Sequence, residues 1–361
     1  MNILIDIAHP AHVHLVRNTY FELIKRGHKV YVTVKYVPSA IALLDNYKIP
    51  YIYLGGKKDS LSGKLFWQIL YNLQVWWIVL SKNIKLGFGT SITLAQISKL
   101  SGLHSIILDD DDDEVEPLFV KYCHPYADVV LSPLGAIRAS KKTVTYEGYH
   151  ELAYLHPGRF TPDVTVLDEI GLKEKEAYFI LRFNAFKAHH DIGEEGLSVE
   201  NKRRLIALLE KRGRVFITTE REIEKEFENY QLSLSPEKIH SLISFATMLV
   251  GDSQTMTSEA AVLGVPSIRC NTFVGKISYL EEEEHKYGLT FGFHPADSEA
   301  MFLKIEELLE IPDLKTKWQV KRQSLLRAKI DVTAFYVWFI ENYPASAKIM
   351  KETSKNDCVF K

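Results

Sequence analysis

The sequence has few cysteines, little net charge and no long apolar run. Its 361 residues hold three scattered cysteines, among which neither a disulfide framework nor metal-ligand spacing is visible. A reducing compartment such as the cytoplasm fits that usage. The formal net charge of −2 gives no indication of a nucleic acid or a strongly acidic partner. The most apolar stretch, 65–86, is interrupted by polar residues and lacks the roughly 20 apolar residues that a membrane span needs.

The first ten residues, MNILIDIAHP, lack the basic start, long apolar core and small-residue cleavage site of a signal peptide. They predict a first β-strand at 2–7, followed by a helix and a second strand at 29–34. This β-loop-α-β opening is typical of a doubly wound α/β domain. Ligands of such sheets bind at the carboxyl ends of the strands, so we expect the loop after the first strand to lie at a ligand site.

Histidines are concentrated in that loop, at His9, His12 and His14. The imidazole of His9 or His12 can act as a general base, or can hydrogen-bond a sugar or a phosphate. The same residues could instead cap and pack a turn. No carboxylate or cysteine with matching spacing lies nearby in the sequence to complete a metal site, so we predict no metal there.

The most informative stretch, 247–270, is TMLVGDSQTMTSEAAVLGVPSIRC. It predicts a strand, a tight turn, a helix capped by Asp252 or Ser253, a stop at Gly264, and another strand. Unpaired N–H groups and the helix dipole make such a helix start a site for phosphate. Glu259, one turn after Thr255, could accept hydrogen bonds from vicinal hydroxyls such as those of a ribose. An ordinary capped helix is the alternative.

The segment GDSQTMTSEAAVLGVP resembles the nucleotide-sugar segment of GT-B glycosyltransferases and of the related UDP-N-acetylglucosamine 2-epimerases. The resemblance implies that Ser253, Gln254 and Thr255 contact the diphosphate and that Glu259 contacts the ribose. The epimerases have a glycine pair where this chain has Gln254 and Thr255. Over its length the sequence is most similar to domain-of-unknown-function family 354, a GT-B-like group. The resemblance implies a nucleotide sugar, of UDP type, as substrate and no required cofactor or metal.

Two βα-repeating halves, separated by the proline-containing segment 156–163, predict an α/β protein with two Rossmann-type doubly wound domains. The resemblance implies that this architecture is of GT-B type. We expect the domains to face a central cleft. They are predicted at 1–155, the acceptor side, and at 164–330, the nucleotide-sugar side. In GT-B folds the last helix crosses back to the first domain, a role that we assign to 331–345. The polar tail, 346–361, is expected to be disordered.

An acidic run of five aspartates and Glu114 follows a predicted strand at 104–108. Any such run satisfies the D-x-D pattern of metal-dependent transferases, so that pattern carries no weight here. In the epimerases an acidic segment at this strand end supplies catalytic carboxylates, which implies Asp109, Asp110 and Glu114 as candidates. Crowded carboxylates raise one another's pKa, which suits acid–base work. A solvated acidic loop is the alternative.

A basic, histidine-bearing loop, RFNAFKAHHDIG, follows the first predicted strand of the second domain, 177–182. Arg182 and Lys187 would suit a diphosphate. The epimerases carry a catalytic histidine in the matching loop, and His190 is its nearest equivalent here. A plain surface loop is the alternative.

Aromatic residues gather on a predicted helix at 64–81, as Phe66, Trp67, Tyr71, Trp76 and Trp77. Such a face could dock on a membrane or hold a lipid-linked acceptor, which would place a cytoplasmic protein at the inner face of the membrane. It could equally pack on the sheet.

Three functions remain open from the sequence. The first is a metal-independent glycosyltransferase in cell-surface or exopolysaccharide glycan synthesis, in which a histidine or carboxylate of the first domain activates a glycan or lipid-linked acceptor. The second is a UDP-sugar 2-epimerase-like enzyme that uses Asp109, Asp110, Glu114 and His190. The third is a non-catalytic protein that binds nucleotide sugars or glycans.

Overall fold

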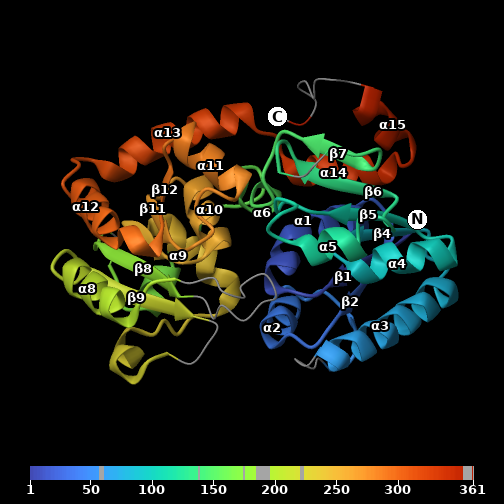
Figure 1. Ribbon diagram of the computed structural model, residues 1–361, viewed down its shortest axis with the longest axis horizontal. Coiled ribbons are helices and arrows are strands. Elements are labelled where there is room, and N and C mark those ends of the chain that lie inside the picture. The colour runs from blue at the N-terminus through green and yellow to red at the C-terminus, as the bar shows by residue number, and fades with distance from the viewer. Residues whose placement is uncertain are drawn as a thin grey trace. The chain divides into compact units, whose positions relative to one another are not determined.

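The computed structural model describes residues 1–56, 61–136, 139–173, 175–183, 196–219, 223–352 and 360. The chain divides into two compact units, Met1–Arg159 together with Lys329–Lys361, and Phe160–Ala328. Each unit contains a parallel β-sheet flanked by helices (Figure 1). The prediction of two doubly wound α/β domains is therefore confirmed.

The first unit has a seven-stranded sheet in the order β3-β2-β1-β4-β5-β6-β7. The order reverses between β1 and β4, which is the kind of switch point where α/β proteins bind ligands. Both faces of the sheet are covered, so its strands are near-continuous apolar runs. The strands are β1 (Asn2–Ile7), β2 (Lys29–Val34), β3 (Ile52–Tyr53), β4 (Leu86–Gly89), β5 (His104–Leu108), β6 (Val129–Pro133) and β7 (Thr143–Tyr146).

Helices of the first unit pack apolar side chains on this sheet. Val75, Val79, Leu94 and Ile107 belong to one buried cluster. Full burial of each such side chain stabilises the fold by about 1.5–3 kcal/mol. The helices are α1 (Pro10–Lys25), α2 (Pro38–Asn46), α3 (Leu61–Ser81), α4 (Ile92–Ser101), α5 (Pro117–Tyr122) and α6 (Leu152–Leu155).

The chain returns to the first unit with α14 (Val332–Glu341), which packs against α1 and α6. Its Phe335 and Tyr336 are buried, and the Tyr336 hydroxyl lies 2.7 Å from that of Tyr146. Apolar burial of this kind is the main contribution to the docking of α14, since the ion pairs around it are partly exposed.

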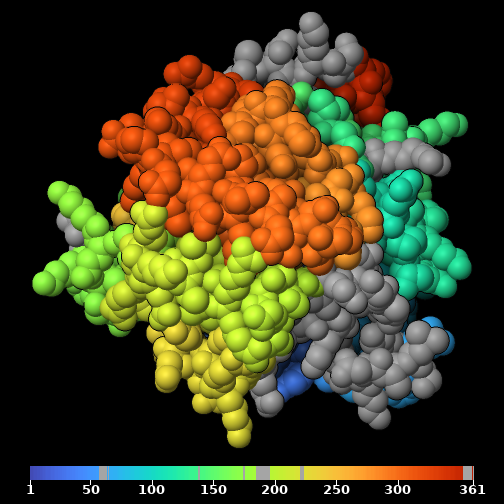
Figure 2. Space-filling model, turned by 60° about the vertical axis from the view of Figure 1, so that its left-hand side comes forward, coloured from blue at the N-terminus to red at the C-terminus, as the bar shows by residue number. Residues whose placement is uncertain are grey.

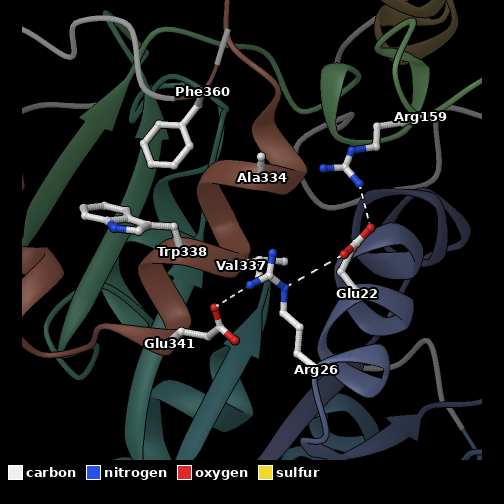
Figure 3. A pocket seen from close by; sticks show the side chains of 8 residues that line it. All are labelled: Glu22, Arg26, Arg159, Ala334, Val337, Trp338, Glu341 and Phe360. Atoms are coloured by element: carbon white, nitrogen blue, oxygen red, sulfur yellow. Dashed lines mark hydrogen bonds and ion pairs between the residues drawn. The ribbon is translucent and has the colours of Figure 1, made fainter.

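A shallow pocket lies beside α14, with charged side chains on its rim (Figure 3). Arg159 is one of the lining residues, with Nη1 2.9 Å from Glu22 and Nε 2.8 Å from Asp331. Arg26 lies 3.2 Å from Glu341. These pairs join α1 to the returning segment.

The expectation of a disordered tail is wrong for part of that tail. Residues Ala345–Glu352 form the helix α15, in which Ala347 and Ser346 are buried. The ring of Phe360 lies 5.3 Å from that of Trp338. Polar composition suggested a solvated tail, but α15 packs against α14 and β7, and Phe360 packs against Trp338.

The second unit has a five-stranded sheet in the order β12-β11-β10-β8-β9, which reverses between β8 and β10. Figure 2 shows α8 and α12 side by side on one face of this unit, where Arg204 of α8 hydrogen-bonds Glu299 of α12 at 2.9 Å. Its strands are β8 (Tyr178–Phe183), β9 (Arg214–Thr219), β10 (Met248–Gly251), β11 (Ser267–Cys270) and β12 (Thr290–Phe293). Its helices are α7 (Val166–Glu169), α8 (Val199–Leu209), α9 (Ile239–Phe245), α10 (Gln254–Leu263), α11 (Ser278–His285), α12 (Ser298–Leu309) and α13 (Leu314–Ala328).

Across the described part of the chain, every helix is too short or too polar to cross a membrane.

Candidate functional site

The turn from β10 into α10 has the predicted form. Ser253 is the N-cap, and its Oγ accepts the N–H of Met256 at 3.3 Å. Gly264 ends the helix in the left-handed conformation, with φ 72°. Asp252 precedes the cap, and its backbone N–H donates to the Arg182 carbonyl at 3.0 Å. The first N–H groups of α10 therefore lie at the carboxyl end of β10, where they could donate hydrogen bonds to an anion.

Gly251 lets β10 approach β8 closely at this point. A Cβ on Gly251 would lie 2.0 Å from the Arg182 carbonyl oxygen, a distance that no side chain tolerates. Gly251 and Arg182 are partners in the parallel register of the two strands. The start of α10 and Arg182 thus occupy neighbouring strand ends at the switch point of the second unit.

Arg182 is buried, and its Nη1 donates to Thr218 Oγ1 of β9 at 3.3 Å. A guanidinium at a strand end suits a diphosphate, since it presents several donors in one plane. Lys187 and His190 lie outside the described residues. Gln254 and Thr255 are half-buried in the first turn of α10.

Glu259 is buried and pairs with a histidine that the sequence analysis missed. Its Oε1 lies 2.9 Å from His240 Nε2 of α9. The ring of Phe160 packs edge-on against His240, with ring centroids 6.2 Å apart. The pair fixes the position of the Glu259 carboxylate, and a ribose contact of Glu259 stays a prediction. In the sequence, nothing local sets His240 apart from the other polar residues of α9, Ser241 and Ser244.

In the first unit, two aspartate–histidine pairs lie just beyond β5. Asp109 Oδ2 is 2.6 Å from His124 Nε2, and Asp110 Oδ1 is 2.9 Å from His150 Nδ1. The structure therefore brings Asp109 and Asp110 together with histidines that lie farther along the chain. Glu114 is exposed and has no described contact with either pair.

Burial changes the protonation of the acidic run. It raises the pKa of Asp109, an effect that the hydrogen bond from His124 opposes and that the charge of Asp110 reinforces. Burial also raises the pKa of Asp111 well above its usual value, with Asp110 as the strongest neighbouring charge. Asp111 was not among the predicted candidates. A raised pKa favours a protonated carboxyl that can donate a proton.

The loop histidines have three different roles. His9 is exposed and caps α1, with Nδ1 accepting the N–H of Ala11 at 3.2 Å. His14 is buried with its ring stacked on Tyr154. His12 is half-buried, and burial lowers its pKa well below the usual value, with the charges of His9, His150 and Lys35 adding to the effect. Its imidazole is therefore neutral at pH 7, and Nδ1 lies 3.5 Å from the N–H of Ala8 as an acceptor.

His150 is a functional candidate that the sequence analysis missed. Its side chain is 9% exposed, and its Nε2 is buried without a hydrogen-bond partner in the part of the chain described. Asp110 accepts the Nδ1 proton, which leaves the lone pair on Nε2. An imidazole oriented by a carboxylate in this way is arranged as a general base.

No local sequence signal marks His150. Gly148, two residues earlier, leaves room for α14, because a Cβ at this position would lie 2.6 Å from the Val332 side chain. The fold alone brings this segment to the end of β5.

Among the described residues, no three or more histidine, cysteine or carboxylate side chains are placed to hold a metal ion.

Several solved structures share this architecture. A UDP-N-acetylglucosamine 2-epimerase crystal structure has a TM-score of 0.64 at 13% identity, over 95% of this chain and 96% of that chain. The S. aureus MnaA–UDP co-structure has a TM-score of 0.68 at 11% identity, over 99% of each chain. Glycosyltransferase VinC in complex with dTDP has a TM-score of 0.62 at 10% identity, over 98% of this chain and 100% of that chain. The chain thus has the fold shared by GT-B glycosyltransferases and UDP-N-acetylglucosamine 2-epimerases.

The chain belongs to the family described as protein of unknown function DUF354, whose model matches residues 1–286. No curated protein matches it by sequence.

Proposed function

We propose that the protein is a metal-independent glycosyltransferase of GT-B type that takes a nucleoside-diphosphate sugar as donor. The observation that carries this proposal is the Ser253-capped start of α10, beside Arg182 at the carboxyl ends of β10 and β8. A helix start and a guanidinium at a switch point together suit the charge of a diphosphate. The nucleotide complexes among the similar structures, with UDP and with dTDP, support a nucleotide ligand for this fold.

In the proposed reaction, the acceptor hydroxyl gives its proton to His150 Nε2. The acceptor oxygen then bonds to the anomeric carbon, and the bond from that carbon to the diphosphate breaks with its electron pair on the leaving oxygen. Asp110, on the other ring nitrogen, stabilises the imidazolium that forms. Backbone N–H groups of α10 and the Arg182 guanidinium stabilise the leaving diphosphate.

We propose a UDP-sugar as donor, with Glu259 and His240 at the ribose, and a glycan or lipid-linked acceptor in polysaccharide synthesis. A spinosyn rhamnosyltransferase complexed with its aglycone is among the similar structures, which supports an acceptor site in this fold. Cys123 and Cys270 are buried free thiols, which favours the cytoplasm as the compartment.

A second candidate function is a UDP-sugar 2-epimerase-like reaction. The observation in its favour is the second pair, Asp109 with His124, together with the raised pKa of Asp109. Elimination and re-addition of the nucleotide need both an acid and a base, and this cluster contains candidates for each.

One experiment separates these functions. The full chain is incubated in deuterated water with UDP-, dTDP-, GDP- and CMP-sugars, with and without free and polyprenyl-linked oligosaccharides, and followed by NMR. A transferase releases the nucleotide when an acceptor is present and leaves the sugar C2 proton in place. An epimerase incorporates deuterium at C2 without any acceptor. Binding without either reaction would indicate a non-catalytic protein, and absence of binding would contradict both enzyme functions.

A further inference from the structure

The helix α3 has two apolar faces, and only one of them is used by the fold. Tyr71, Val75 and Val79 are buried in the core of the first unit. Figure 1 shows α3 beside α4 in the outer layer of this unit. The opposite face exposes large apolar side chains, which are Leu65, Phe66, Ile69, Leu73, Trp76, Trp77 and Leu80.

These exposed side chains form one continuous stripe. They recur every three or four residues, so they lie above one another along a single side of the helix. The stripe covers 15 residue steps and is therefore roughly 22 Å long, at about 1.5 Å per residue. Trp77 is 66% exposed and Leu73 is 58% exposed. Single exposed apolar residues scattered over a surface are normal, but these lie next to one another. A contiguous stripe of this length marks an interaction surface.

The aromatic residues expected on one face of this helix lie on two opposite faces of α3. Tyr71 packs inward, and Trp67 packs partly inward, where its ring lies 3.4 Å from the position a Cβ on Gly56 would occupy. Phe66, Trp76 and Trp77 point outward. Packing on the sheet and docking on a partner are thus not alternatives, because α3 has residues for both.

The charged residues in α3 and directly after it are all lysines. The helix sequence from Leu61 to Ser81 contains no aspartate or glutamate. Exposed Lys82 and Lys85 follow directly after its last turn. A partner surface that is apolar inside and negatively charged outside complements this arrangement.

We propose that the outer face of α3 docks the protein on a lipid bilayer that contains anionic lipids. A helix that presents tryptophan, phenylalanine and leucine on one side, with lysines at its end, matches an interfacial membrane helix. The tryptophans suit the headgroup region, and the lysines pair with lipid phosphates. The inner face of α3 is held by the core of its own unit, so the helix lies in the membrane plane. This proposal does not depend on the enzymatic function.

The test is co-sedimentation of the full chain with vesicles of phosphatidylcholine alone and of phosphatidylcholine mixed with phosphatidylglycerol. We expect binding to the anionic vesicles that weakens with salt. Replacing Trp77→Ser should lower the partition coefficient by about tenfold, because a large apolar side chain is lost from the stripe. Lys82→Gln combined with Lys85→Gln should weaken binding to the anionic vesicles and remove most of the salt dependence.

The matched control is Leu303→Ser on α12, since Leu303 is 67% exposed and lies in the other unit. Its partition coefficient should equal that of the unmodified protein. Circular dichroism checks that each variant is folded. If the protein binds neither type of vesicle, the proposal is overturned. It is also overturned if Leu303→Ser lowers the partition coefficient as much as Trp77→Ser does. A dimer that Leu73→Ser dissociates, without vesicle binding, would overturn it in favour of a second copy of this chain.

Discussion

The two units offer a ligand different chemistry, although both are parallel α/β sheets. The second unit presents backbone N–H groups at the start of α10, together with one guanidinium, Arg182. The first unit presents titratable side chains, in the pairs Asp109–His124 and Asp110–His150. One arrangement suits a fixed negative charge, and the other suits the movement of a proton. The comparison teaches that binding and proton transfer can be tested separately, one unit at a time.

The largest expected effect is on turnover, through the first unit. Replacing His150→Gln should lower kcat by roughly 10²–10⁴-fold, because a positioned general base contributes that much. Affinity for the nucleoside diphosphate should remain within a few-fold in calorimetry. His294→Gln is the matched control, since His294 caps a short helix with Nδ1 3.2 Å from the Ala296 N–H. If His150→Gln lowers kcat and nucleotide affinity by the same factor, the first unit does not act in proton transfer alone, which contradicts the separation of the two functions.

The next effect concerns the buried pair of the second unit. Glu259→Ala leaves His240 without its carboxylate and should cost about 3–5 kcal/mol in the free energy of unfolding, measured by urea denaturation. Glu259→Gln keeps the shape and a hydrogen-bond acceptor, so it should cost much less. A ribose contact predicts that Glu259→Gln still weakens nucleotide binding about tenfold. Unchanged affinity in a folded Glu259→Gln variant would assign the pair to structure alone.

A smaller effect is expected from the strand contact under the diphosphate site. Gly251→Ala places a methyl group against the Arg182 carbonyl and should cost about 3 kcal/mol, since overpacking forces the backbone apart. Nucleotide binding should weaken with it, while the first unit keeps its own thermal transition. Gly56→Ala is the control, because its nearest contact there would be an ordinary 3.4 Å to Trp67. If Gly251→Ala binds and unfolds normally, the close approach of β10 and β8 is not needed.

The smallest effect is a pH dependence from His12. Burial lowers the pKa of His12 in the folded state, so the unfolded chain binds one more proton between that value and about 6.5. Stability should therefore fall as the pH drops below about 6.5, by at most about 1.4 kcal/mol per pH unit. His12→Gln should flatten this part of the curve of Tm against pH, whereas the exposed His285→Gln should not. A slope that is the same in both variants would contradict the burial of His12.

The sequence was sufficient where the determining residues are neighbours. The strand at 267–270, the Ser253 cap and the Gly264 stop are consequences of local rules for turns and helix ends, and the structure has all of them. The parallel order of both sheets follows from alternating β and α segments.

Long-range partners were not predictable, because no local rule places them. Asp110 was a candidate, but His150 joins it only through the order of β5, β6 and β7 in the sheet. His240 reaches Glu259 because α9 packs on α10. The two faces of α3 are hidden for the same reason, since apolar residues around the whole helix do not show which of them the sheet covers.

The central claim is that the first turn of α10 receives a diphosphate, and a single charge tests it. Gln254→Glu adds a negative charge where the helix dipole favours one, so Tm should stay the same or rise slightly. The same charge would repel a diphosphate, so calorimetric affinity for UDP should fall at least tenfold, while Gln254→Met keeps it within a few-fold. That result would place the nucleotide at the start of α10. A Gln254→Glu protein that binds UDP as tightly as the unmodified chain would contradict the claim.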